Sequence, residues 1–398
     1  MKEVNVLEAL RQASLREVGQ VFQDEMRGII KESFISLMFE EARQLCGGFY
    51  HPDAESGYSR GGSAKGVFTL NGSKESVIRP RVRKKGIGSD GEVELLSYKA
   101  GKNADEVRNL ITLALGAGVS SNDVGELFAG NASSSSSASR LWVTEGLARL
   151  DTLRARDLSS EEFFCLMIDG ISLGSDVTAV AALGITTDGR KKMLDFEVGS
   201  SENKGVCDGL LKRLSKRGFK DHQDRRLLVV LDGSEALRSS VVGHFNDPII
   251  QRCLIHKERN IRSYLSKKHH TELARLFTRL RRAEGEDAGR EAEEDLRDFL
   301  KSKSKSALDS LNEAGEDLIA LHVIGAPSTL NKTLLNTNCI ENAFNNVRRK
   351  TGRVKRWRAE TDQAERWMAF GMLEAEKGFN RVRGHADIGL LLEKLRRS

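Results

Sequence analysis

The sequence contains little proline, little cysteine and no long apolar run, and each shortage excludes a class of protein. Only 4 of its 398 residues are proline, and 39% are hydrophobic against 30% charged, as in a helix-rich globular protein rather than a disordered or fibrous one. No segment approaches the roughly 20 apolar residues that cross a bilayer, and the N-terminus MKEVNVLEALRQ has no apolar signal core. We therefore expect a cytoplasmic protein.

The cysteines indicate neither a disulfide framework nor a metal site. They number 5, an odd count, they are scattered along the chain, and no CxxC pair occurs among them. This pattern argues against a disulfide framework and favours reduced, buried thiols.

The distribution of charged residues along the sequence is more informative than the net charge. A net charge of +6 is modest for this length, so composition alone does not predict nucleic-acid binding. However, 7 of the 11 residues in RRKTGRVKRWR (348–358) are Lys or Arg, RPRVRKK (79–85) forms a second basic cluster, and acidic residues gather in 285–298.

The N-terminal part reads as helices interrupted by a small β region. Residues 3–46 carry apolar positions at helical spacing, and VFTLNGSKESVIRPRVRKK predicts a hairpin turned at Asn71-Gly72. Three short helical patterns follow in 105–149, with Gly and Ser between them. This is how a helix-turn-helix looks in sequence, although an ordinary helical bundle fits the spacing as well.

Residues 162–260 change to an α/β pattern. FFCLMID and RRLLVVLD are apolar runs of strand length, TAVAALGI and KKMLDFEVG are joined by a hairpin signal at Asp188-Gly189, and IIQRCLIH reads as a fifth strand. KGVCDGLLKRLSKRG and SEALRSSVVGHF read as helices, the first closed by Gly218. The predicted order is strand, two-stranded hairpin, helix, strand, helix, strand, and a charged helical stretch occupies 257–335.

Two buried strands end in the same way, in Asp169-Gly170 and Asp232-Gly233. Each Asp-Gly taken singly is more typical of a turn. A carboxylate at the end of a fully buried strand is costly unless it is paired or binds a cation, and two on neighbouring strands would repel each other. A divalent ion such as Mg²⁺ resolves both problems, because it prefers oxygen ligands.

The third carboxylate is expected from a helix, and Glu341 in NTNCIENAFNNVRRK is the best candidate. Asn338 can cap this helix, which places Glu341 in its first turn as in a capping box, and that role alone would explain a Glu here. One face of the helix carries Asn345, Arg348 and Arg349, in reach of phosphates beside the ion.

Four blocks together resemble the Mutator-type family of bacterial insertion-sequence transposases: MIDGISL, VVLDGSEAL, QRCLIHKERNI and NTNCIENAFNNVRRKTGRVKRW. The resemblance covers about residues 58–369. It implies an α/β fold with an RNase-H-like mixed sheet, a helical insertion between the second Asp and the Glu, and an N-terminal, mostly helical region that binds terminal inverted repeats. It implies Asp169, Asp232 and Glu341 as a metal-binding catalytic triad, and it matches Cys253 and His256 to the family's CxxH signature.

The resulting division of the chain has six parts. They are 1–46 amphipathic helices with a possible role in dimerisation, 47–102 a small β region, 103–155 a helix-turn-helix-like DNA-binding region, 156–256 the first part of the catalytic core, 257–335 a helical insertion, and 336–398 the last part of the core with a basic C-terminal region.

The predicted chemistry is cleavage and strand transfer of DNA by two Mg²⁺ ions, for which Mn²⁺ can substitute. No covalent protein intermediate is needed. The predicted partners are double-stranded DNA, both inverted repeats and target, and a second copy of the chain, because two element ends must be held together. Phosphate contacts are assigned to a basic run in which Trp357 either stacks on a base or packs beneath the loop: Arg348, Arg349, Lys350, Arg353, Lys355, Arg356 and Trp357.

Cys253 and His256 are open to several interpretations. They are half of a possible zinc site, but no second ligand pair accompanies them. We favour a supporting hydrogen bond or a DNA-backbone contact for His256. Two other functions compete with a transposase: a nuclease on the same sheet, and a DNA-binding regulator that keeps the sheet only as a scaffold.

Overall fold

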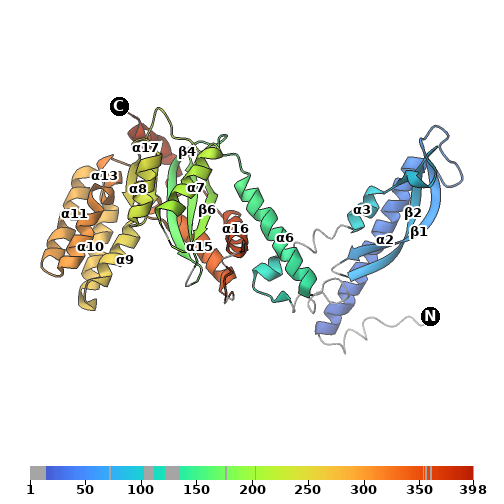
Figure 1. Cartoon of the computed structure of the whole chain (residues 1–398), viewed down its shortest axis with the longest axis horizontal. Helices are drawn as coiled ribbons and strands as arrows, with labels where there is room; N and C mark the ends of the chain where they lie inside the picture. Colours follow the sequence, from blue (N-terminus) through green and yellow to red (C-terminus); the bar gives the residue numbers. More distant parts are fainter. Residues whose placement is uncertain are drawn as a thin grey trace. The chain divides into compact units, whose positions relative to one another are not determined.

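The computed structural model describes residues 15–70, 73–102, 112–121, 135–174, 177–201, 203–352, 354, 356–358 and 361–397. The chain divides into two compact units, Met1–Val143 and Thr144–Ser398, called here the N-terminal and C-terminal units. Figure 1 follows their elements along the sequence. None of the helices among the described residues is both long and apolar enough to cross a membrane.

The N-terminal unit packs one long helix against a small antiparallel sheet. Helix α2 (Leu15–Cys46) confirms the predicted helical spacing for its described part, and strands β1 (Tyr58–Leu70) and β2 (Ser73–Lys84) confirm the predicted hairpin. The turn residues Asn71 and Gly72 lie outside the described residues. The unit is completed by η1 (Gly88–Gly91), β3 (Glu92–Val93) and α3 (Leu96–Lys102).

The predicted helix-turn-helix falls mostly outside the described residues, which include only 112–121 and then 135 onward in this region. Helix α6 (Ser135–Arg154) corresponds to the third predicted helix. It crosses the boundary between the units, and Leu150 and Leu153 belong to the core of the C-terminal unit.

The C-terminal unit is built on a mixed five-stranded sheet in the order β6-β5-β4-β7-β8. The first three strands along the chain are antiparallel neighbours, whereas β4, β7 and β8 run parallel. This confirms the predicted alternation of strands and helices and the mixed α/β class. The strands are β4 (Phe163–Ser172), β5 (Thr178–Thr186), β6 (Lys191–Gly199), β7 (Leu228–Leu231) and β8 (Ile249–Arg252).

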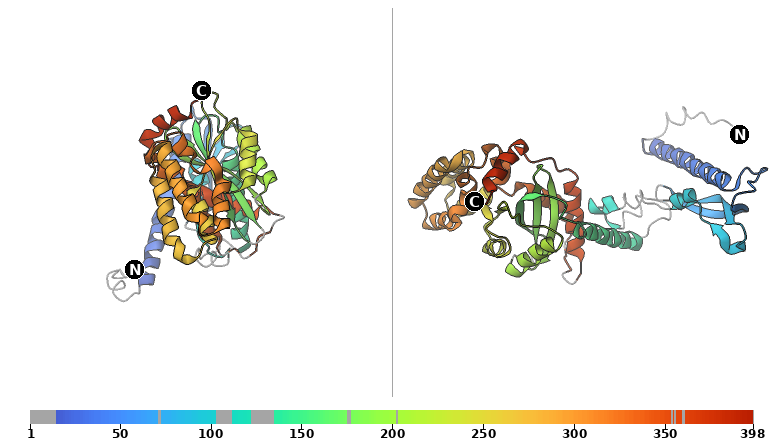
Figure 2. Two further views of the ribbon diagram at one scale, coloured as in Figure 1. Left: turned by 90° about the vertical axis from the view of Figure 1, so that its left-hand side faces the viewer. Right: turned by 90° about the horizontal axis from the view of Figure 1, so that it is seen from above.

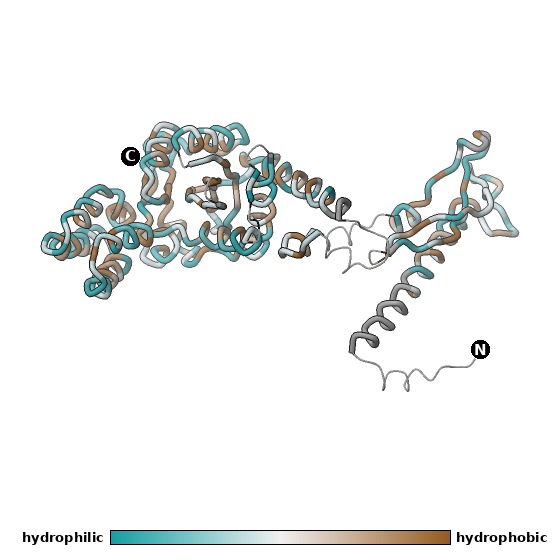
Figure 3. Tube along the Cα trace, turned by 60° about the horizontal axis from the view of Figure 1, so that its bottom comes forward, coloured by the Kyte–Doolittle hydropathy of each residue, from teal (hydrophilic) through white to brown (hydrophobic). Residues whose placement is uncertain are grey.

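Helices cover both faces of this sheet, and the alternation of side chains along a strand explains the two cores. In β4, Leu166 and Ile168 join the core beneath α7 (Lys204–Lys216) and α8 (Glu235–His244), whereas Met167 and Ile171 join the larger core beneath α15 (Asn338–Thr351) and α16 (Gln363–Glu376). Figure 3 shows the hydrophobic segments concentrated in the central strands. A strand covered on both faces therefore needs the continuous apolar run that β4 has.

The predicted helical stretch 257–335 is helical, and it lies beside the β8 edge of the sheet (Figures 1 and 2). Its α-helices are α9 (Leu254–Ser263), α10 (His270–Arg282), α11 (Gly285–Lys301), α12 (Lys305–Ala314), α13 (Ala320–Val323) and α14 (Asn331–Leu334). Short 3-10 helices join them: η2 (Lys267–His269), η3 (Gly315–Leu318) and η4 (Ser328–Leu330). The chain closes with η5 (His385–Asp387) and α17 (Ile388–Leu395).

Two local predictions were wrong. The fifth strand ends at Arg252, four residues before the end of the apolar run IIQRCLIH, because the Cys253 carbonyl accepts a hydrogen bond from Lys257 N and α9 begins there. Thr337, and not Asn338, is the N-cap residue of α15, and its side chain makes no capping hydrogen bond. The predicted capping box therefore does not form, and Glu341 is not explained by it.

Candidate active site

Asp169 is a buried carboxylate that points toward the face of the sheet covered by α15. It shares this face with Met167 and Ile171, because side chains two residues apart on a strand point the same way. Its side chain is 2% exposed, and Oδ1 accepts a hydrogen bond of 2.9 Å from Gly170 N. Its Oδ2 is buried and has no hydrogen-bond partner among the described residues. Such an oxygen is costly unless a cation approaches it.

Asp232 lies next to Asp169 at the carboxyl edge of the sheet. Ile168 pairs with Leu231 in the parallel register of β4 and β7, so the two aspartates occupy neighbouring positions directly after that pair. Asp232 also forms the turn that its Asp-Gly sequence suggested, since Oδ1 accepts a hydrogen bond of 2.9 Å from Ser234 N. Its side chain lines a cavity of about 340 Å³ together with His256.

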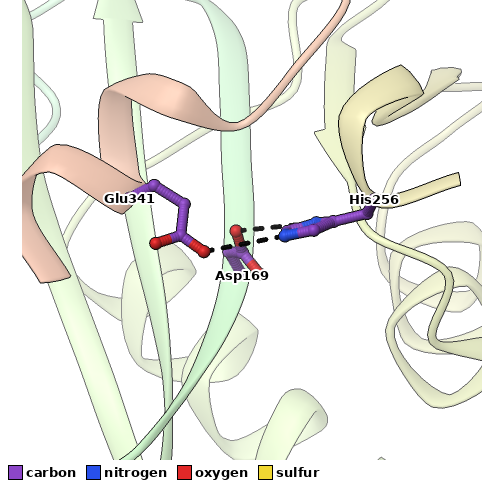
Figure 4. Close-up of side chains that lie close together, drawn as sticks. All are labelled: Asp169, His256 and Glu341. Carbon is purple, nitrogen blue, oxygen red and sulfur yellow. Dashed lines mark ion pairs between the residues drawn. The ribbon is translucent and has the colours of Figure 1, made fainter. Parts of the chain in front are cut away.

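Glu341 and His256 are brought to the sheet by two different helices, α15 and α9. His256 lies beside both carboxylates and approaches them with its two ring nitrogens: Nδ1 is 4.0 Å from Asp169 Oδ2, and Nε2 is 3.6 Å from Glu341 Oε1 (Figure 4). One ligand atom each of Asp169, His256 and Glu341 lies within 4.8 Å of the others, a spacing that can hold a metal ion. Asp232, beside Asp169, borders this group.

The pKa values show how strongly these side chains interact. Burial raises the pKa of Asp169 to about 7, with further contributions from Asp232 and Glu341, while His256 and the Thr337 hydroxyl oppose the rise. His256 lowers the pKa of Glu341 to about 2, and Arg348 adds to this effect. The contacts of His256 with Cys253 and Glu341 raise its own pKa to about 10. The site therefore favours positive charge between its carboxylates.

Cys253 interacts with the His256 side chain, and it does not belong to the group of metal-ligating side chains that the structure forms among the described residues. It is 1% exposed and precedes α9 as its N-cap residue, and the Thr337 hydroxyl lies 3.5 Å from its sulfur. Although burial raises the pKa of Cys253, its interaction with His256 lowers it below the usual value overall. Among the described residues, the metal-ligating cluster that the structure forms contains His256 with carboxylates and no cysteine.

Cations surround the carboxylates on two sides. Arg348 Nη1 lies 3.0 Å from Glu341 Oε2 and also donates to Asn345 Oδ1 at 3.2 Å, so these three predicted residues form one chain of contacts along α15. On the Asp232 side, Arg252 and Lys257 are buried, and both pair with Glu313 of α12. The Lys257–Glu313 distance is 2.7 Å. These cations and Glu313 line the cavity beside Asp232.

The rest of the predicted basic run is only partly gathered at the site. Arg349 is exposed and donates to Asn346, Lys350 lies 4.9 Å above the Phe370 ring, and Arg356 is exposed. Arg353 and Lys355 lie outside the described residues. The predictions that these side chains contact DNA therefore stay predictions.

Trp357 packs against the protein. Its Nε1 donates a hydrogen bond of 2.7 Å to the Leu173 carbonyl, and a Cβ atom added at Gly174 would lie 2.7 Å from its ring. The glycine therefore makes room for the indole. Of the two roles considered for Trp357, the structure shows the packed one.

The sequence predicts a supporting role for His256, and the structure specifies the partners: its ring nitrogens approach two of the predicted carboxylates, Asp169 and Glu341. The CxxH spacing is the sequence feature that indicates this position, because it places a histidine in the first turn of a helix that follows a buried cysteine. The cations Arg252 and Lys257 carried no such signal, because Glu313, which binds both, is distant in sequence.

Comparison with known proteins adds a family to this geometry. A family model described as "Transposase, Mutator family" matches residues 1–380. The transposase for insertion sequence element IS905 of Lactococcus lactis is 24% identical over 314 residues, which are 76% of this chain and 77% of the relative. The transposase for IS1201 of Lactobacillus helveticus is 24% identical over 341 residues, 81% of this chain and 87% of the relative. The transposase for IS6120 of Mycolicibacterium smegmatis is 28% identical over 247 residues, 59% of this chain and 73% of the relative.

Proposed function

Because the chain belongs to the Mutator family of transposases, we propose that it cuts and rejoins DNA with Asp169, Asp232 and Glu341 as its catalytic carboxylates. The observation that carries this proposal is the buried Asp169 oxygen that has no hydrogen-bond partner among the described residues and faces Glu341 and His256. A buried carboxylate oxygen that has no hydrogen-bond donor and lies beside a second acidic group is typical of a cation-binding site.

The sheet supports an RNase-H-like core for this chemistry. The sheet has three antiparallel strands followed by two parallel ones, in the order β6-β5-β4-β7-β8, with Asp169 on the central strand and Asp232 directly after the neighbouring strand β7. The helices between Asp232 and Glu341 are consistent with the helical insertion that the family resemblance implied.

The donor set fits divalent cations that prefer oxygen ligands. Asp169 and Glu341, whose oxygens lie within metal-ligand spacing of each other, would hold two Mg²⁺ ions, or Mn²⁺ in their place, together with Asp232, which follows the strand next to Asp169. His256 would assist these carboxylates, because imidazole is a poor ligand for magnesium. When bound, such ions lower the pKa of water and stabilise the leaving oxygen in an attack on a phosphodiester.

The chain's own groups have distinct tasks in this reaction. The Gly170 amide fixes one oxygen of Asp169, and the Ser234 amide fixes one oxygen of Asp232, so both carboxylates are oriented before substrate binds. Arg348 lies beside Glu341 and can neutralise a phosphate there. No Ser, Tyr or Cys nucleophile is required, because water and then the freed 3′-hydroxyl attack phosphorus directly.

The proposed substrates are the terminal inverted repeats of an insertion sequence and a target duplex, in the cytoplasm of a bacterial cell. A homodimer would hold the two ends of the element together. The N-terminal region is the candidate for reading the repeats.

A cleavage assay tests the triad. Full-length protein is incubated with an end-labelled inverted repeat and Mg²⁺ or Mn²⁺, and nicking and joining are read on a gel. Asp169→Asn, Asp232→Asn and Glu341→Gln should each abolish cleavage and keep repeat binding. Asp309→Asn, which removes an exposed carboxylate on α12, is the matched control and should cleave normally.

The same gel separates the competing functions. Nicking followed by joining supports a transposase, nicking without joining indicates a nuclease, and a band shift without nicking indicates a regulator. A triad variant that cleaves at the wild-type rate would remove that residue from the proposal.

A further inference from the structure

A second cavity in the C-terminal unit, of about 910 Å³, is strongly basic and is lined in part by α9 and α15, the two helices that carry His256 and Glu341. Helices α9, α10, α14 and α15 contribute to its wall. Ile255 and Asn338 line it, one position before His256 on α9 and three positions before Glu341 on α15. It lies among helices that the sequence identified only as a charged insertion.

The wall of the cavity carries more positive than negative side chains. Five cationic side chains line it against two carboxylates, Glu258 and Glu284. Glu258 is occupied by Arg262, at 2.7 Å, and by Arg281, and Glu284 accepts a hydrogen bond of 2.8 Å from Ser328. The three remaining cations form no ion pair within the part of the chain that the structure describes: Arg259, Arg282 and Lys332.

These three cations differ from others on the same helices. On α10, Arg275 is paired with Glu272, and Arg279 is paired with Asp295 and Glu291. The positive charges of these two arginines are therefore neutralised by carboxylates of the protein. Arg282, one turn later, faces the cavity instead. Exposed, unpaired guanidinium groups around one concavity create a positive potential that attracts an anion.

We propose that this cavity binds the phosphodiester backbone of a DNA strand next to the phosphodiester that is cut. The inference rests on the proposed function for its position beside the carboxylates. The wall contains Arg, Lys and Asn side chains, which donate to phosphate oxygens, and it contains no aromatic residue on which a base could stack. The contact is therefore with backbone and independent of sequence, and it positions the strand without reading it.

The first test is the salt dependence of DNA binding by the full chain in EDTA, which requires no cleavage. Arg259→Ala, Arg282→Ala and Lys332→Ala are combined in one variant. We expect the slope of log affinity against log salt to become shallower by about 3, since each lost phosphate contact changes it by about 1. The matched control removes three exposed lysines of the same helical region, Lys267, Lys268 and Lys305, and should change the slope little.

Equal slopes for the two triple variants would overturn the proposal, because the effect would then be one of net charge. The melting temperature of each variant is measured in parallel, and the three substituted cations are exposed, so the fold should persist.

A second test locates the strand. Ser328→Cys places a thiol on the cavity wall, whereas Ser306→Cys places one on the exposed surface of α12. Four of the five native cysteines are buried and Cys339 is half-buried, so a photo-crosslinker attaches selectively to the new thiol. Crosslinks from position 328 should map within a few nucleotides of the cut on repeat DNA, or on target DNA if that duplex occupies the cavity. Crosslinking no stronger than from position 306 on either DNA would overturn the proposal.

The two proposals fail in different ways. If the triad variants lose cleavage but the cavity variant keeps the wild-type salt slope and crosslinks, only the cavity assignment is wrong. If the cavity variant loses affinity while a triad variant still cleaves, the triad is wrong and the DNA contact of the cavity stands, with its place relative to the cut given by the crosslinks.

Discussion

Asp169 and Asp195 are two buried carboxylates of the same sheet in opposite electrostatic surroundings. Asp195 on β6 is 0% exposed, and its Oδ2 accepts hydrogen bonds from Arg213 Nε at 3.1 Å and Arg217 Nη1 at 3.2 Å. Arg154 approaches its other oxygen at 3.8 Å. Asp169 on β4 is 2% exposed, yet its Oδ2 has no hydrogen-bond partner among the described residues and faces other acidic groups.

The difference separates a carboxylate that stabilises the fold from one that is available for chemistry. Around Asp195, guanidinium groups compensate the cost of burying the charge. Around Asp169 that cost is compensated only in part, by His256 at 4.0 Å and by the Thr337 hydroxyl. A buried acid that lacks matching donors is where a cation or a substrate can bind with the greatest gain.

The largest expected effect is on cleavage. Asp169→Asn should lower the cleavage rate by at least about 1000-fold, because it removes a charge that acts on the reacting phosphate through the bound cation. Its unfolding free energy should not fall, because the substitution also removes repulsion from Asp232 and Glu341. Single-turnover cleavage and urea denaturation measure the two quantities. An Asp169→Asn protein that cleaves normally, or one that unfolds far more easily, would contradict the distinction between a catalytic Asp169 and a structural Asp195.

Asp195→Asn should show the reverse pattern. Removing this carboxylate leaves guanidinium groups without their partner, at a cost of about 3 kcal/mol in unfolding free energy. Cleavage per folded molecule should remain at the wild-type level, because Asp195 faces α7 and not α15. Urea denaturation and an active-site titration check the two halves of this prediction, and unchanged stability would contradict the structural role of Asp195.

Magnesium should distinguish the two carboxylates directly. At 100 times its dissociation constant, a cation that binds only the folded state stabilises it by about 2.7 kcal/mol. We expect this gain in the wild-type protein and in Asp195→Asn, which starts from a lower stability, and its loss in Asp169→Asn. Thermal melts with and without Mg²⁺ measure it. An equal Mg²⁺ shift in Asp169→Asn would exclude this residue as a ligand.

The smallest effect concerns a third carboxylate, Glu92 in the N-terminal unit, which resembles Asp195 in having guanidinium partners. Arg81 and Arg79 lower its pKa from 4.5 to about 2. A lowered folded-state pKa means that the stabilisation is complete above pH 4.5 and is lost as pH falls toward 2. Solvent screening limits it to about 1 kcal/mol.

Hydrogen exchange of the β1 and β2 amides in the full chain measures this effect. Glu92→Gln should exchange faster than the wild type at pH 6, and the two should converge near pH 2. Glu55→Gln, which removes an exposed acid of the same unit, is the control and should match the wild type throughout. If the exchange rates of Glu92→Gln and the wild type still differ at pH 2, the effect comes from packing and not from the charge of Glu92.

Much of the candidate site was predictable because its members carry local signals. Asp169 and Asp232 each follow an apolar run of strand length, and the register of β4 and β7 then makes them neighbours. Glu341 was predicted in the first turn of a helix, and it lies there, although the capping box that partly suggested it does not form. The strand order followed from the same alternation of patterns.

Other features had no local signal. Nothing in the spacing shows that Arg252 and Lys257 share Glu313, or that Trp357 packs beside Gly174. The contacts of His256 with two carboxylates depend on how α9 and α15 pack beside the sheet.

The sequence by itself determined which segments form strands and helices, and which acidic residues end the buried strands, because hydrophobic periodicity and turn residues act over a few neighbours. Only the tertiary structure decided which charges are matched. Asp195 meets three arginines and Asp169 meets a histidine and a glutamate, since such encounters depend on helices that pack from distant parts of the chain.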